Sequence, residues 1–106
     1  MAWVLLLLAG LFEIVWAFYL KQSDGFTRLV PAVITPVAMF ASFGLLSLSM
    51  RVLPLGTAYT IWTGIGAVGA FVVGIAVLGE PLGAMRLVAA ALILSGIVLM
   101  QLSTPA

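Results

Sequence analysis

The feature that most constrains this chain is an apolar run from position 2 to position 20 that contains a single carboxylate, Glu13. As a helix rising 1.5 Å per residue, the run would span about 28 Å, close to the hydrocarbon thickness of a bilayer. An ionisable residue inside such a segment is energetically costly and is functional by default. The run therefore predicts a membrane helix that carries a binding or proton-transfer group.

Composition supports a membrane location for the whole chain. Of its 106 residues, 65% are hydrophobic and only 7% are charged, which is too few to cover the surface of a soluble domain. The absence of Cys and His excludes disulfides, thiol nucleophiles, His-based catalysis and Cys or His metal sites. A net charge of +1 gives no basic patch for nucleic acid. We expect an integral membrane protein that is not an enzyme and has no metal or cofactor.

Three more apolar runs follow the first, separated by short polar breaks. The first break contains a turn signal at Asp24-Gly25, and Thr57 can cap the helix that follows the second break. The sequence thus predicts a single all-α transmembrane domain over 1–106. Its helices are expected at about 2–20, 29–50, 57–78 and 84–102.

The distribution of positive charge gives the chain little preference for one orientation. Four helices place both chain ends on one side, so Lys21, Arg28 and Arg86 lie on the opposite side and Arg51 lies with the ends. This small bias barely fixes topology. Many transporters enclose a midplane site between inverted repeats. We therefore infer an antiparallel, dual-topology homodimer embedded in membrane lipid.

The depths of three residues favour this arrangement. Counting from the helix ends, Glu13 lies about 10 Å from one membrane edge, and Trp62 and Ser42 lie about 8 and 12 Å from the other. Within one copy, Trp62 and Glu13 are at different levels. In an inverted pair, the Trp62 and Ser42 of one copy come level with the Glu13 of the other.

The chemistry expected of this site is a competition between a proton and a cation. A carboxyl group away from water is neutral when protonated and attracts a cation when charged. Trp16 follows Glu13 by three residues, so its indole N–H can reach the carboxylate, and aromatic faces attract cations. The expected substrate and proton site comprises Glu13, Trp16, Ser42, Tyr59, Trp62 and Thr63.

Simpler structural roles are open for each of these residues. Glu13 can be a neutral acid bonded to a hydroxyl group. Trp16, Tyr59 and Trp62 can be aromatic residues of the interfacial belt. Gly66, Ala70 and Gly74 form a small-residue ridge suited to close helix packing, and Gly64 and Gly66 are more often packing residues than hinges. Glu80 and the cations are expected to be solvated loop charges.

The chain resembles the small multidrug resistance family over essentially its whole length. The resemblance rests on Glu13, on Gly25-Phe-Thr-Arg28, on Gly56-Thr-Ala-Tyr-Thr-Ile-Trp-Thr-Gly-Ile-Gly66 and on Leu94-Ser-Gly96. It is most similar to the guanidinium exporter subtype, as indicated by Trp16, Met39, Ala41-Ser-Phe43, Tyr59, Trp62-Thr63 and Glu80-Pro81. Members of the subtype often carry a Lys where this chain has Gln101, which puts any role of that Lys in doubt.

The resemblance implies an antiparallel dimer in a bacterial inner membrane that exports guanidinium against protons by alternating access. Both copies' Glu13 would share one site. The resemblance also implies a bend of the third helix at Gly64 and Gly66. In the fourth helix it implies a dimer contact at Ala91, Ser95 and Gly96.

Three other functions are compatible with the sequence. The first is a broad exporter of quaternary ammonium and lipophilic cations, against which Trp16 and Met39 argue. The second is a small dual-topology ion channel, and the third is a membrane subunit that does not transport. Glu13 distinguishes them, because a channel needs no titrating acid and a structural subunit should tolerate Glu13→Gln.

Overall fold

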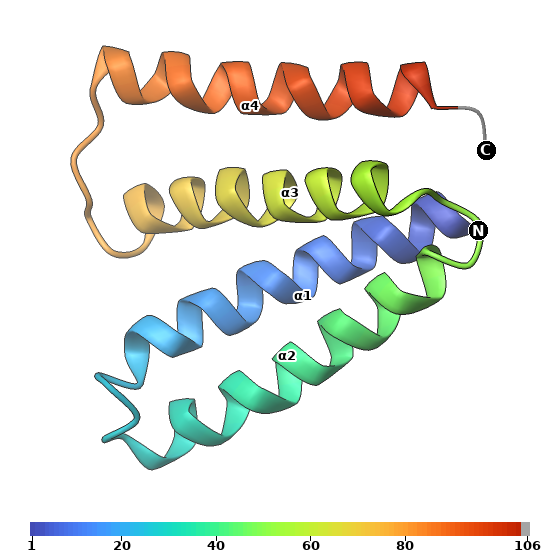
Figure 1. The fold of residues 1–106 in the computed structure, drawn as a ribbon. Helices are drawn as coiled ribbons and strands as arrows, with labels where there is room; N and C mark the ends of the chain where they lie inside the picture. The colour runs from blue at the N-terminus through green and yellow to red at the C-terminus, as the bar shows by residue number, and fades with distance from the viewer. Residues whose placement is uncertain (105–106) are drawn as a thin grey trace.

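Four helices make up the computed structural model, which describes residues 1–104 (Figure 1). They are α1 (Ala2–Gln22), α2 (Leu29–Ser49), α3 (Leu55–Ala76) and α4 (Ala84–Ser103). Each is long and apolar enough to cross a membrane, with 21, 21, 22 and 20 residues respectively. This confirms the prediction of an all-α chain with four spanning helices. The observed helix ends differ from the predicted ones by at most two residues.

The helices are arranged in the order α2, α1, α3, α4, so α1 and α3 are central (Figure 1). Among the described residues, the backbone of α4 approaches only that of α3. The start of α1 and the end of α4 lie on one side, and the α1–α2 and α3–α4 loops lie on the other (Figure 1). The chain is a flat slab of 43 × 34 × 16 Å.

The α1–α2 loop is a tight left-handed turn. Asp24, Gly25 and Phe26 have φ angles of 48°, 71° and 65°, the region that non-glycine residues seldom adopt. Ser23 stabilises the turn, because its hydroxyl donates to the Leu20 carbonyl at 2.7 Å and accepts from the Phe26 N–H at 3.1 Å. The predicted turn at Asp24-Gly25 is confirmed.

The start of α3 differs from the prediction. The helix begins at Leu55, directly after Pro54, whose extended backbone (φ −61°, ψ 152°) leads into the first turn. The Pro54 carbonyl accepts from the N–H of Ala58 at 3.0 Å. Thr57 therefore lies within the first turn and does not cap the helix. Its hydroxyl pairs with that of Thr104 at 3.0 Å, which joins the start of α3 to the end of α4.

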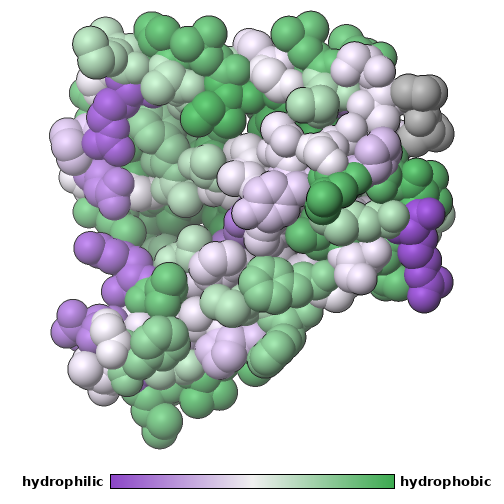
Figure 2. Space-filling view, viewed as in Figure 1, coloured by the Kyte–Doolittle hydropathy of each residue, from purple (hydrophilic) through white to green (hydrophobic). Residues whose placement is uncertain are grey.

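Most of the surface is apolar, and the hydrophilic side chains gather at the ends of the helices (Figure 2). The buried core lies toward the terminal side of the slab and consists of Leu6, Ala9, Leu46, Leu53, Ala58, Ile61 and Trp62. No residue of α4 is buried. Large exposed apolar faces of this kind are covered by lipid or by another protein chain.

Candidate functional site

Glu13 of α1 faces α3. Its carboxylate packs against Gly66, where an added Cβ would overlap Glu13 Oε1 and would lie 2.8 Å from Cγ. Ile14 packs in the same way against Gly69, three residues further along α3. Because glycine has no side chain, Gly66 and Gly69 leave a notch in α3, and the Glu13 carboxylate lies in this notch.

Two polar atoms on this face of α1 are buried without a hydrogen-bond partner in the described chain: Glu13 Oε1 and Trp16 Nε1. The prediction that Trp16 donates to Glu13 is therefore wrong for this structure. The two side chains diverge, because the carboxylate points to Gly66 whereas the indole ring contacts Phe43 of α2, with centroids 6.5 Å apart. Buried polar groups are nearly always paired, so each of these two atoms is a candidate for contact with a ligand or a second chain.

Ser42 joins three helices one turn away from Glu13. Its hydroxyl donates to the Ala9 carbonyl of α1 at 2.6 Å and accepts the indole N–H of Trp62 from α3 at 2.9 Å. Both side chains are buried. The Trp62 N–H is thus already used within the chain, and the ring face is what remains for a cation. The position of Ser42 beside Ala9 agrees with the depth count, which places it about 6 Å from Glu13 along the membrane normal.

Aromatic rings form a continuous series from α1 across α2 to α3. Trp16 contacts Phe43, Phe43 contacts Trp62 with centroids 5.7 Å apart, and Trp62 contacts Tyr59 at 5.6 Å. The first two pairs are edge-to-face and the third is tilted, and edge-to-face pairs at these distances are favourable. Phe43 is the residue that sequence reasoning did not place in the site. Its position next to Ser42, facing the same helices, was the available signal.

The remaining predicted site residues lie at the periphery. Tyr59 is 54% exposed, at the end of the aromatic series. Thr63 is exposed on α3, one turn before Gly66. The structure therefore places Glu13 in the α3 notch and Trp16 against α2, and it leaves Thr63 on an open face.

The two glycines predicted as a hinge both permit close helix packing. Gly66 faces Glu13, whereas Gly64 faces α4, where an added Cβ would lie 2.7 Å from Cγ1 of Ile97. The α-helix continues without interruption through both positions. A bend at Gly64 and Gly66 in another state of the protein stays a prediction.

The predicted dimer contact on α4 is open in the single chain. Ala91, Ser95 and Gly96 are all exposed. The Ser95 hydroxyl donates to the Ala91 carbonyl of its own helix at 2.8 Å, and nothing lies within 4 Å of an added Cβ at Gly96. This face has no partner in the described residues, and its role in a dimer stays a prediction.

Comparison with known proteins identifies the relatives of this chain. The family model described as "Small Multidrug Resistance protein" matches residues 1–93. Proteins named "Guanidinium exporter" from Citrobacter freundii, Salmonella typhimurium and Escherichia coli K12 are each 55% identical over 104 residues. Each alignment covers 98% of this chain and 99% of the relative. With its four spanning helices and these bacterial relatives, the chain is a multi-pass bacterial membrane protein. It belongs to the small multidrug resistance family.

Proposed function

We propose that this protein exports guanidinium and small guanidinyl cations in exchange for protons, and that Glu13 binds either one. The observation that carries the proposal is the carboxylate in the Gly66 notch, with Oε1 buried and unpaired. Glu13 is also the only acidic residue within the four described helices. The similarity to three proteins named as guanidinium exporters supports the choice of cation.

The chemistry of a buried carboxylate accounts for the coupling. Burial penalises the charged form unless an opposite charge compensates, so the group binds a cation or a proton but not both. Export of one species then requires entry of the other.

The chemistry of guanidinium accounts for the selectivity. The ion is planar and weakly hydrated, and it offers parallel N–H donors that match the two oxygens of a carboxylate. In the proposed site, the faces of the Trp16 and Trp62 rings would add cation–π attraction. A quaternary ammonium ion has the charge but no N–H to donate, so it would leave the Glu13 carboxylate without hydrogen bonds.

An antiparallel homodimer with alternating access completes the proposal. The single chain is only 16 Å thick and has an outer helix without buried residues, so it cannot enclose a cation on all sides. A second, inverted copy would cover the Glu13 face and bring its own Glu13 into the same site. The glycines of α3 would allow one copy to shift relative to the other.

The test uses purified protein reconstituted into liposomes, with proton movement recorded when a cation gradient is applied. We expect gradients of guanidinium and methylguanidinium to drive proton movement across the membrane, and a gradient of tetraethylammonium to have no effect. Glu13→Gln should abolish exchange, while Asp24→Asn, a matched acid in a loop, should leave it intact. Full exchange by Glu13→Gln would overturn the mechanism. Equal activity with tetraethylammonium would favour a broad cation exporter, and guanidinium flux without proton movement would favour a channel.

A further inference from the structure

The α3–α4 loop folds back onto the end of α3. Gly79 adopts a left-handed conformation with φ 69°, and the N–H of Glu80 then donates to the Gly74 carbonyl at 3.0 Å. The Glu80 carboxylate packs on Gly74, where an added Cβ would lie 2.5 Å from Oε1. The acid is thus held in one position by the loop backbone and by the lack of a side chain at Gly74.

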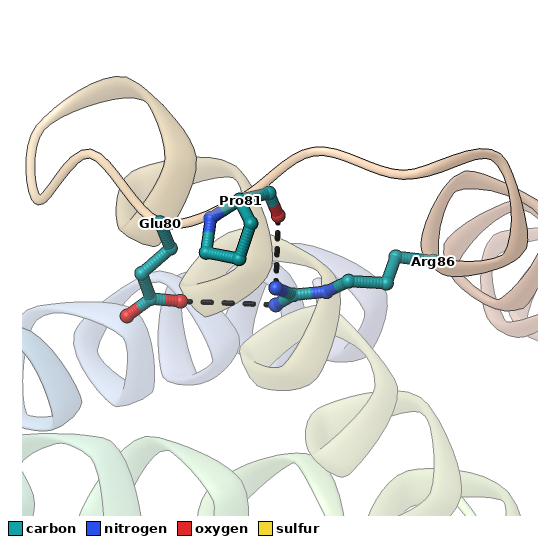
Figure 3. A network of polar contacts seen from close by, with 3 residues as sticks. All are labelled: Glu80, Pro81 and Arg86. Carbon is teal, nitrogen blue, oxygen red and sulfur yellow. Dashed lines mark hydrogen bonds and ion pairs between the residues drawn. The ribbon is translucent and has the colours of Figure 1, made fainter.

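The guanidinium group of Arg86, in the first turn of α4, is surrounded by three kinds of acceptor. One nitrogen donates to the Pro81 carbonyl at 2.8 Å, and another lies 3.8 Å from Glu80 Oε1 (Figure 3). The guanidinium carbon lies 5.3 Å from the centre of the Phe71 ring. Glu80 and Arg86 are both exposed, in line with the expectation of solvated charges, and the loop also brings them close together.

A carboxylate, a carbonyl oxygen and an aromatic face are the groups that recognise guanidinium. A free guanidinyl cation presents the same planar donors as the arginine head group. We propose that Glu80, the Pro81 carbonyl and the Phe71 ring form a second site for guanidinyl cations at the loop end of α3, and that the side chain of Arg86 occupies it as an internal ligand. The inference rests on the proposed function only for the presence of such cations at this loop.

Two cavities adjoin this group, one lined by Glu80 and the other by Phe71 and Arg86. A groove of about 130 Å³ beside Glu80 runs between α1 and α3, and at about 30 Å³ per water-sized unit it can hold a cation of four heavy atoms. A cavity of about 210 Å³ lies between α3 and α4 and is lined by Phe71, Arg86 and apolar side chains. The second cavity suits guanidinyl cations that carry a small apolar group.

The internal ligand can be displaced. The side chains of Arg86 and Glu80 are 43% and 41% exposed, and their 3.8 Å separation is longer than a charge-assisted hydrogen bond. Exposed ion pairs of this kind contribute little to stability. Lys21 also lines the groove beside Glu80, and its positive charge opposes a second cation. We therefore expect weak binding in rapid exchange.

The test keeps Glu13→Gln in every variant, so that the membrane site is silent. Binding of methylguanidinium is recorded by saturation transfer to its methyl protons, with protein in lipid nanodiscs. Adding Arg86→Met, which keeps an unbranched side chain but removes the guanidinium group, should raise binding at least about tenfold, because it frees an acceptor for one charge-assisted hydrogen bond. Adding Glu80→Gln to that variant should return binding to the starting level. Tetramethylammonium has the positive charge but no N–H, so Arg86→Met should not increase its binding.

A second measurement retains the native Arg86 and so does not depend on the folding of the variants. In Glu13→Gln alone, the Nε–H signal of Arg86 should shift saturably as methylguanidinium displaces it. An unchanged signal, or equal binding with Glu80 intact and replaced, would overturn the proposal and make Arg86 a structural contact. Both outcomes are independent of exchange by the wild-type protein, so failure of the proposed function would be recognised separately in the liposome assay.

Discussion

Replacement of Gly66 by Ala tests whether the notch in α3 positions Glu13. An added Cβ would overlap Oε1 and lie 2.8 Å from Cγ, closer than the ordinary separation of about 3.5–4.0 Å between carbon atoms. The obstructing atoms are the end of a flexible side chain, so the carboxylate can move away by about 1 Å. The substitution should therefore displace the acid and leave the helices in place.

The magnitudes of the opposing terms indicate that function will change more than stability. Ala is favoured over Gly in a helix interior by about 1 kcal/mol, whereas overpacking costs about 1–3 kcal/mol. The net loss of stability should be about 0–2 kcal/mol. A displacement of about 1 Å in a positioned group can reduce a rate about 100-fold, so we expect exchange to fall about 10- to 100-fold.

The assay compares guanidinium-driven proton movement in liposomes with thermal unfolding in detergent. Gly56→Ala is the matched control, because Gly56 lies in the first turn of the same helix and nothing lies within 4 Å of its added Cβ. It should keep the wild-type rate. Gly66→Ala with an unchanged rate and unchanged stability would refute the conclusion that the glycine notch holds Glu13.

Substitutions at Ser42, Gly64 and Ser95, two of them with a second-site change, examine contacts between and along the helices. Ser42→Ala should destabilise the protein by about 1–3 kcal/mol in denaturant titrations, because it leaves the buried indole N–H of Trp62 unpaired. In the Ser42→Ala background, Trp62→Phe should cost less stability than it does in the wild-type protein. Equal costs in the two backgrounds would contradict the hydrogen bond between Trp62 and Ser42. Gly64→Val should separate α3 from α4 and cost about 1–3 kcal/mol, partly recovered by Ile97→Ala; no recovery would contradict the contact. Ser95→Ala should change stability by less than about 0.5 kcal/mol, since its hydroxyl bonds only its own helix, whereas Ser95→Trp should convert dimer to monomer in gel filtration if this face is the dimer contact.

The four helices could be predicted because a helix needs about 20 apolar residues to cross a bilayer, and the sequence contains four apolar runs of about that length. The turn at Asp24-Gly25 could be predicted because its residue types tolerate the left-handed conformation. The sequence predicts the start of α3 two residues late, because Thr57 is a typical capping residue, whereas the helix begins directly after Pro54. Helix ends depend on such local signals, and here Pro54 and Thr57 indicate different starting residues for α3.

Helix pairing was less accessible to sequence reasoning. Helices that are apolar on every side have no amphipathic stripe to mark the face that packs inward. The small-residue ridge of α3 was a correct indication of close packing, yet its members have different neighbours: Gly66 faces Glu13, Gly74 faces Glu80, and Ala70 is exposed. The direction of the Trp16 indole depends on a side-chain rotamer and on Phe43, which spacing along one helix does not specify.

The pattern of paired and unpaired polar atoms separates the structural part of the site from its ligand-binding part. Ser42 and Trp62 satisfy each other within the chain, whereas Glu13 Oε1 and Trp16 Nε1 do not. A buried polar group without a partner costs several kcal/mol in lipid, so these two atoms need a ligand, a proton or a second chain. In the proposed dimer, two Glu13 carboxylates would share one site, and like charges in one site cannot both ionise without compensation. A bound cation or a bound proton would provide that compensation, and the need for one or the other is what would link the two fluxes.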